Sequence, residues 1–190
     1  MTGSKRQQLI ISGVGGQGVI FLTRLLAETA IRKGKSVFTS ETHGMAQRGG
    51  TVISHLKVGG FSSPLIRPFK ADGLLALRMH GLDQHGVYLK PDSWAIVNHL
   101  KHDTSEPDRP VFAIGADRIA QKIDNLRSVN LIVLGFAMAV ILKNVDNPFF
   151  CSLKDIKAVL ESQMGHKQKM LNASLTALET GYDVGMKAKF

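Results

Sequence analysis

The chain has 190 residues, 44% of them hydrophobic, which is enough for one domain with a sizeable core. Its net charge of +9 predicts a surface that attracts anions. The basic residues are scattered, with few aromatics among them, so no nucleic-acid partner is expected. The single cysteine, Cys151, excludes a disulfide framework and any metal or iron–sulfur site built from several thiolates of this chain, and no metal is expected.

The start of the chain carries no recognisable secretory signal. The longest apolar run, residues 131–142, is shorter than the ~20 residues that a membrane-spanning helix needs. A lone cysteine suits a reducing compartment. We therefore expect a cytoplasmic protein without a membrane partner.

The first 41 residues predict a strand, a glycine-rich turn, a helix and a second strand. Residues 8–13 form an apolar run closed by glycine, and apolar residues then recur at helical spacing from 19 to a stop at Gly34. Residues 36–41 are the second strand candidate. This length is typical of a parallel βαβ crossover.

The rest of the chain continues to alternate strands with helices. Further strands are predicted at 51–58, 73–78, 94–99 and 111–115. Helices are predicted at 115–123, at 129–143, at 152–164 with Ser152 as N-cap, and at 168–180 with Gly181 as the stop.

This pattern predicts one α/β domain over residues 1–190, with C-terminal helices from about residue 152. The expected architecture is a Rossmann-like three-layer sandwich, in which helices cover both faces of a mostly parallel sheet. The helix at 129–143 is apolar on nearly all sides, so it should pack centrally.

The turn after the first strand is a candidate phosphate site. Gly13, Gly15 and Gly18 satisfy the spacing G-x-G-x-x-G between a strand and a helix, with Gly16 and Gln17 as further candidates. The glycines would permit a tight turn, backbone approach by a ligand and close helix packing, and the helix N-terminus would favour an anion. The pattern alone is equally compatible with a turn that binds nothing.

A dinucleotide is one candidate ligand. Glu41 follows the loop by about 20 residues, where an acid that binds ribose is expected. This leaves open a stand-alone NAD(P)-binding oxidoreductase, although little chain remains for a substrate domain.

A second loop, within residues 40–59, gathers polar groups between two strands. Its candidates for an active-site loop are Glu41, Thr42, His43, Gln47 and Arg48, while Gly49 and Gly50 would allow close approach to a ligand. A guanidinium such as that of Arg48 is suited to carboxylate or phosphate. A hydrolase built on Glu41 and His43 would lack a recognisable nucleophile, and we assign no general acid or base. Taken singly, each of these side chains is more typical of an irregular loop.

Several motifs in order resemble a known family. They are GVGGQGV (13–19), ETHGMAQRGG (41–50), SPLI (63–66), ADGLLAL (71–77), NLIVLG (130–135) and a closing set of Asn172, Ala177, Leu178, Gly181 and Tyr182. The chain resembles the gamma subunit or gamma domain of the 2-oxoacid:ferredoxin oxidoreductases. Within that family it is most similar to the beta subunit of the indolepyruvate type.

The resemblance implies an oxidoreductase subunit that is inactive alone. A large partner subunit would carry thiamine diphosphate and 4Fe–4S clusters, decarboxylate a 2-oxoacid to acyl-CoA and pass electrons to ferredoxin. No cofactor is assigned to this chain alone. Coenzyme A is the candidate ligand of the glycine loop, and the loop of Glu41 to Arg48 would meet the partner's thiamine site. The isolated chain is expected to be able to dimerise through its partner surfaces. Arg78 and Lys70 depart from the family pattern, which often has an acid and a small residue there.

Overall fold

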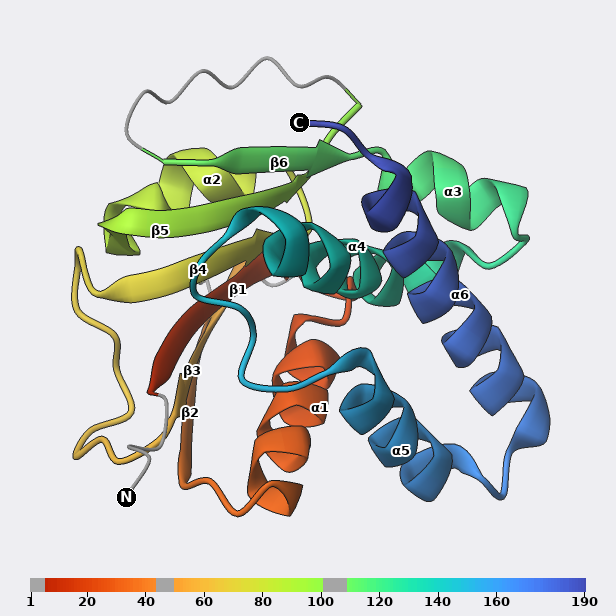
Figure 1. Ribbon diagram of the computed structural model, residues 1–190, viewed down its shortest axis with the longest axis horizontal. Coiled ribbons are helices and arrows are strands. Elements are labelled where there is room, and N and C mark those ends of the chain that lie inside the picture. The colour runs from red at the N-terminus through yellow and green to blue at the C-terminus, as the bar shows by residue number, and fades with distance from the viewer. Residues whose placement is uncertain (1–5, 44–49, 101–108) are drawn as a thin grey trace.

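The computed structural model describes residues 6–43, 50–100 and 109–190 (Figure 1). Six strands form one sheet: β1 (Gln7–Val14), β2 (Val37–His43), β3 (Thr51–Val58), β4 (Ala71–Ala76), β5 (Leu89–Asn98) and β6 (Val111–Ile114). The α-helices are α1 (Val19–Arg32), α2 (His80–His85), α3 (Ala116–Lys122), α4 (Val129–Asn144), α5 (Leu153–Met164) and α6 (Gln168–Lys187). Two short 3-10 helices are η1 (Gly86–Tyr88) and η2 (Leu126–Ser128).

The strand order is β2-β3-β1-β4-β5-β6. Strand β3 pairs antiparallel with both β1 and β2, whereas the β1–β4, β4–β5 and β5–β6 pairs are parallel. The prediction of a mostly parallel sheet is confirmed. The expected βαβ crossover needs a correction: β1 and β2 run parallel, but β3 turns back after β2 and takes the position between them.

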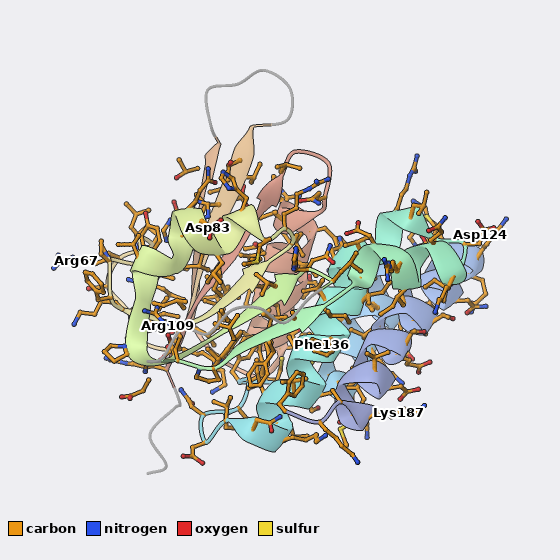
Figure 2. The ribbon with its side chains drawn as sticks, turned by 90° about the horizontal axis from the view of Figure 1, so that it is seen from above. Arg67, Asp83, Arg109, Asp124, Phe136 and Lys187 are labelled. Carbon is orange, nitrogen blue, oxygen red and sulfur yellow. The ribbon has the colours of Figure 1, made fainter. Side chains whose placement is uncertain are left out.

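Helices cover both faces of the sheet, as predicted, but unequally. Helices α1 and α4 share one hydrophobic core with α5 and α6 and with one face of the sheet. A smaller core on the other face lies under α2 and η1. Figure 2 shows this from above, with Asp83 on α2 and Phe136 on α4 on opposite sides of the sheet. The sequence pattern did not predict α2, which has only six residues.

Helix α4 is the central helix of the larger core. Of its 16 residues, 12 are buried, which confirms the central packing expected from its sequence. The segment Leu126–Asn144 is long and apolar enough to cross a membrane, but 72% of an apolar 18-residue stretch within it is buried inside the protein. That burial is typical of a core helix.

Helix α6 runs to Lys187, so the predicted stop at Gly181 is wrong. This glycine lies inside the helix where α6 contacts α4: a Cβ on Gly181 would be 2.0 Å from the carbonyl oxygen of Ile132. A Cβ on Gly135 of α4 would likewise lie 2.0 Å from the carbonyl oxygen of Leu178. Glycine weakens a helix by about 1 kcal/mol relative to alanine, and here it permits two backbones to touch.

Helix α5 begins as predicted. Ser152 is its N-cap, and its side chain forms a capping box with Asp155 three residues later. The Asp155 carboxylate also accepts a hydrogen bond of 2.9 Å from the ammonium of Lys33, at the C-terminal end of α1.

Candidate functional site

The glycine loop is a four-residue turn between the end of β1 at Val14 and the start of α1 at Val19. Gly16 and Gly18 have φ angles of 87° and 82°, in the left-handed region that favours glycine. The amide of Gln17 donates to the carbonyl of Val14 at 3.1 Å, and the Gln17 side-chain oxygen accepts from the amide of Val14 at 2.9 Å. The predicted ligand residue Gln17 therefore uses its oxygen to brace the turn.

The glycines of this loop serve different purposes. A Cβ on Gly13 would lie 2.9 Å from the Gln17 side-chain oxygen, and a Cβ on Gly18 would lie 2.0 Å from Nδ2 of Asn130 on α4. A Cβ on Gly15 or Gly16 would meet no atom within 4 Å. Packing therefore requires Gly13 and Gly18, while Gly15 and Gly16 leave their backbone open to a ligand.

An open hollow of about 300 Å³ lies at this turn, lined by the glycines and by Ile20 and Val52 among others. Among the described residues, no side chain caps the N-terminus of α1, and its first turn contains no acid. The free amides and the helix dipole at this end favour an anion, phosphate above all.

The structure brings the two predicted loops together. The amide of Gly15 donates to the carbonyl of Gly50 at 3.3 Å, and Val14 pairs with Thr51 across β1 and β3. Because Thr42 pairs with Ile53, the end of β2 lies at the same edge. Of the other candidates, Gln47, Arg48, Gly49 and the side chain of His43 lie outside the described residues.

Glu41 does not occupy the position of a ribose-binding acid. It lies on the edge strand β2, opposite Ser54 of β3, so two strand spacings of about 4.8 Å separate β2 from β1. The dinucleotide fold expects this acid on the strand next to the glycine turn. The inserted β3 therefore disfavours NAD(P) here.

Comparisons with known proteins agree with the motif order. A family model described as "Pyruvate ferredoxin/flavodoxin oxidoreductase" matches residues 8–184, almost the whole chain. The chain belongs to this family. Within it, indolepyruvate oxidoreductase subunit IorB of Archaeoglobus fulgidus is 27% identical over 204 aligned residues, which cover 97% of this chain and 98% of that protein. Ketoisovalerate oxidoreductase subunit VorA of Methanothermobacter thermautotrophicus is 28% identical, and the match covers 90% of this chain but 35% of that longer protein.

Solved structures of other oxidoreductases have the same fold. The gamma subunit of a keto/oxoacid ferredoxin oxidoreductase from Geobacter sulfurreducens superposes with a TM-score of 0.73 at 21% identity, over 96% of this chain and 99% of that one. The 2-oxoglutarate:ferredoxin oxidoreductase of Magnetococcus marinus, solved with 2-oxoglutarate, coenzyme A and succinyl-CoA bound, gives 0.77 at 21% identity. The match covers 97% of this chain but only 32% of that longer chain.

One polar cluster near the family's glycine loop was missed by sequence reasoning. The hydroxyl of Ser12 on β1 lies 2.8 Å from Nδ1 of His85 on α2, and Nδ1 of His55 on β3 accepts from the amide of Ile66 at 3.3 Å. The ring of Tyr88 packs edge-on against His55, with centroids 5.3 Å apart. Burial lowers the pKa of both histidines, so their neutral forms are favoured. These residues come from four segments that are separate in the sequence, so no sequence motif with a fixed spacing could indicate the cluster.

The departure at Arg78 also falls at this edge of the sheet. The amide of Leu77, just after β4, donates to the carbonyl of Ser12 at 2.8 Å, which holds the end of β4 beside the end of β1. Arg78 follows and is exposed. Where the family often has an acid, this chain thus adds positive charge to the edge that carries the glycine loop.

Proposed function

We propose that this chain is the small subunit of a coenzyme A-dependent 2-oxoacid:ferredoxin oxidoreductase of the indolepyruvate kind. The family assignment and the IorB relative of matching length support this proposal. The chain would complete the active site of a large subunit that carries thiamine diphosphate and iron–sulfur clusters. The partner's groups supply decarboxylation and electron transfer to ferredoxin, and this chain helps to hold coenzyme A.

The contact between Gly15 and Gly50 is the observation that carries the proposal. It joins an open, phosphate-seeking turn to the second loop, which in the proposed complex meets the partner's thiamine site. Coenzyme A bound by its phosphates at the glycine turn would thus extend past Gly50 toward the partner's thiamine site. Fixing one end of a long substrate lowers the entropy cost of presenting its thiol at the other.

The glycine turn fits a pyrophosphate by its chemistry. Gly15 and Gly16 let a phosphate approach the backbone without a Cβ in the way, and the uncapped amides of α1 supply donors. Exposed Arg78 adds a cation at the same edge. We therefore assign Gly15, Gly16 and the first turn of α1 to the phosphates of coenzyme A.

The cysteine of this chain does not offer a cluster ligand. Cys151 is buried, and burial, with Asp155 nearby, raises the pKa of its thiol to about 12. An iron–sulfur cluster requires several thiolates. We therefore place the clusters on the partner, and the reduced thiol supports the cytoplasm as the proposed location.

Complex formation and ligand choice test this proposal together. Co-expressed with the large subunit encoded in the same genome, the chain should elute with it as one complex in size-exclusion chromatography. In titrations of that complex, coenzyme A should bind and NADH should not. Separate elution of the two chains, or tight NADH binding with hydride transfer by the small chain alone, would favour the stand-alone NAD(P) oxidoreductase.

A further inference from the structure

Strand β2 (Val37–His43) ends the sheet and has one side without a partner, which we call the free edge. It is the first strand in the sheet order and pairs only with β3 (Figure 1). No described residue outside β3 forms a hydrogen bond with it. The strand contains no proline and pairs with β3 without a bulge. An edge that neither proline nor a bulge interrupts is a template for a further strand.

The pairing with β3 decides which backbone groups of β2 face the free edge. The carbonyl of Ser36, just before β2, accepts from the amide of Gly59, just after β3, at 2.8 Å. Hydrogen-bonding groups alternate along an antiparallel pair, so the even-numbered residues of β2 direct theirs to β3 and the odd-numbered residues direct theirs outward. Val37, Thr39 and Glu41 therefore offer amides and carbonyls to another strand.

The side chains along this edge are complementary to a reversed copy of themselves. Lys35 lies three residues before Phe38, and Glu41 lies three residues after it. Both charged residues are partly exposed, and neither forms an ion pair with another described residue. Phe38 is 37% exposed, although its side chain is large and apolar. A cation and an anion at equal distances from an exposed aromatic ring favour antiparallel pairing with a second copy.

One register satisfies the backbone and the side chains together. With Phe38 opposite Phe38 of the second copy, Val37 faces Thr39, and these two residues exchange hydrogen bonds through their outward groups. The same register places Lys35 opposite Glu41, twice, on one face of the sheet. The two phenylalanines form the non-hydrogen-bonded pair, in which side chains are closest. A shift by two residues would place each phenylalanine opposite a serine and separate the charges.

We propose that two copies of this chain pair antiparallel through β2, centred on Phe38, and join their sheets into one. This gives the expected self-association of the isolated chain a defined surface, and it does not depend on the proposed function. Helix α1 packs over β1, β2 and β3. In the dimer the two β3 strands lie about 14 Å apart, three strand spacings of about 4.8 Å. Packed helices need only about 8–10 Å, so both copies of α1 fit on the same face.

The test reverses charges in the isolated 190-residue chain. Lys35→Glu and Glu41→Lys each replace two attractive pairs at the interface by two repulsive pairs. The double variant Lys35→Glu/Glu41→Lys restores both attractive pairs. Lys122→Glu on α3 is the matched control, because Lys122 is exposed and the change in net charge equals that of Lys35→Glu. Circular dichroism checks the fold of each variant.

Sedimentation equilibrium should show a wild-type dimer that Lys122→Glu leaves unchanged. Each single reversal at the free edge should weaken the dimer about tenfold or more, because like charges directly opposite one another destabilise strand pairing. The double variant should recover the wild-type affinity. An equimolar mixture of the two single variants should form a heterodimer, because each reversed charge then faces an opposite charge on the other chain.

Thr39→Pro tests the backbone contribution. It removes an amide that faces the free edge and leaves the hydrogen bonds to β3 intact, and proline is tolerated on edge strands, so the variant should fold as a monomer. A wild-type chain that stays monomeric at millimolar concentration would overturn the inference. So would a dimer that the reversals and Thr39→Pro weaken no more than the control does, or a mixture of the single variants that stays monomeric. The proposed function is decided separately, by reconstituted activity.

Discussion

The amide of Gly15 donates a hydrogen bond of 3.3 Å to the carbonyl of Gly50, across the end of the β1–β3 pair. These residues belong to two loops that lie far apart in the sequence and carry the family's most recognisable motifs. The hydrogen bond places Gly50 beside the glycine turn, and in the proposed function the two loops are neighbouring walls of one site. A substitution in the glycine loop can therefore also affect the position of Gly50 and the second loop.

Gly15→Ala should separate ligand binding from folding. A Cβ at this position meets no atom within 4 Å, so the free energy of unfolding should stay within about 0.5 kcal/mol of the wild type. The added methyl group occupies the face that the phosphates approach, so coenzyme A-dependent turnover of the reconstituted complex should fall about tenfold. The readouts are urea unfolding and the Michaelis constant for coenzyme A. Unchanged turnover would remove the glycine turn from the ligand site.

Gly18→Ala provides the contrast within the same loop. Its Cβ would lie 2.0 Å from Nδ2 of Asn130, and its φ of 82° is left-handed, so the variant should lose stability. The left-handed conformation alone costs about 1–2 kcal/mol for a residue with a Cβ. A Gly18→Ala protein as stable as Gly15→Ala would contradict the packing described here.

Gly181→Ala tests the contact between α4 and α6. Its Cβ would meet the carbonyl oxygen of Ile132 at 2.0 Å, and backbone cannot move aside cheaply, so a loss of about 1–3 kcal/mol is expected. Gly86→Ala is the matched control, because its nearest neighbour would be a Leu82 methyl group at 3.8 Å and its φ is −57°. Urea unfolding, followed by the fluorescence of buried Trp94, measures both. Equal stability of the two variants would refute the close approach of the helices.

The stability of the chain should depend on two neutral histidines, His55 on β3 and His85 on α2. Burial lowers the pKa of His55 and His85 in the folded protein. As the pH falls below the unfolded value of about 6.5, the unfolded chain therefore takes up protons before the folded one, and the free energy of unfolding decreases. Above that pH the contribution is fully present.

His85→Gln should flatten this pH dependence, because glutamine can still form a hydrogen bond with the hydroxyl of Ser12 but does not titrate. His166→Gln, at an exposed position between α5 and α6, should keep the wild-type slope. Urea unfolding between pH 5 and pH 8 measures both variants. The same slope in His85→Gln as in the wild type would mean that the cluster does not control acid stability.

Cys151 should be unreactive in the folded chain. Its thiol is buried, and its raised pKa of about 12 leaves almost no thiolate at pH 8. A thiol reagent such as an aromatic disulfide should label it only after denaturation in urea. Rapid labelling of the native chain would show that the segment before α5 opens readily.

Much of the fold could be predicted because strand and helix periods repeat clearly along the chain. The errors have physical causes. The position of β3 between β1 and β2 is set by pairing between strands, which no local pattern records. Gly181 marks either a helix end or a close contact, and only the presence of α4 decides between them. Helix α2 is too short to show a helical period.

The candidate site was predictable where motifs are continuous in sequence. The glycine loop and Gly50 meet in the structure. Two side chains differ from the expected roles: Gln17 braces the turn, and Glu41 lies on the edge strand. Asn130 was noticed only as part of a motif. Its contact with Gly18 depends on how α4 packs against α1, so that contact could be found only in three dimensions.

Reconstituted activity tests the central claim most directly. The large subunit is assayed for ferredoxin reduction and acyl-CoA formation from indolepyruvate and other 2-oxoacids, with and without this chain. We predict that both products require both subunits and coenzyme A, and that this chain alone forms neither. Acyl-CoA formation by the large subunit at the same rate without this chain would contradict the account.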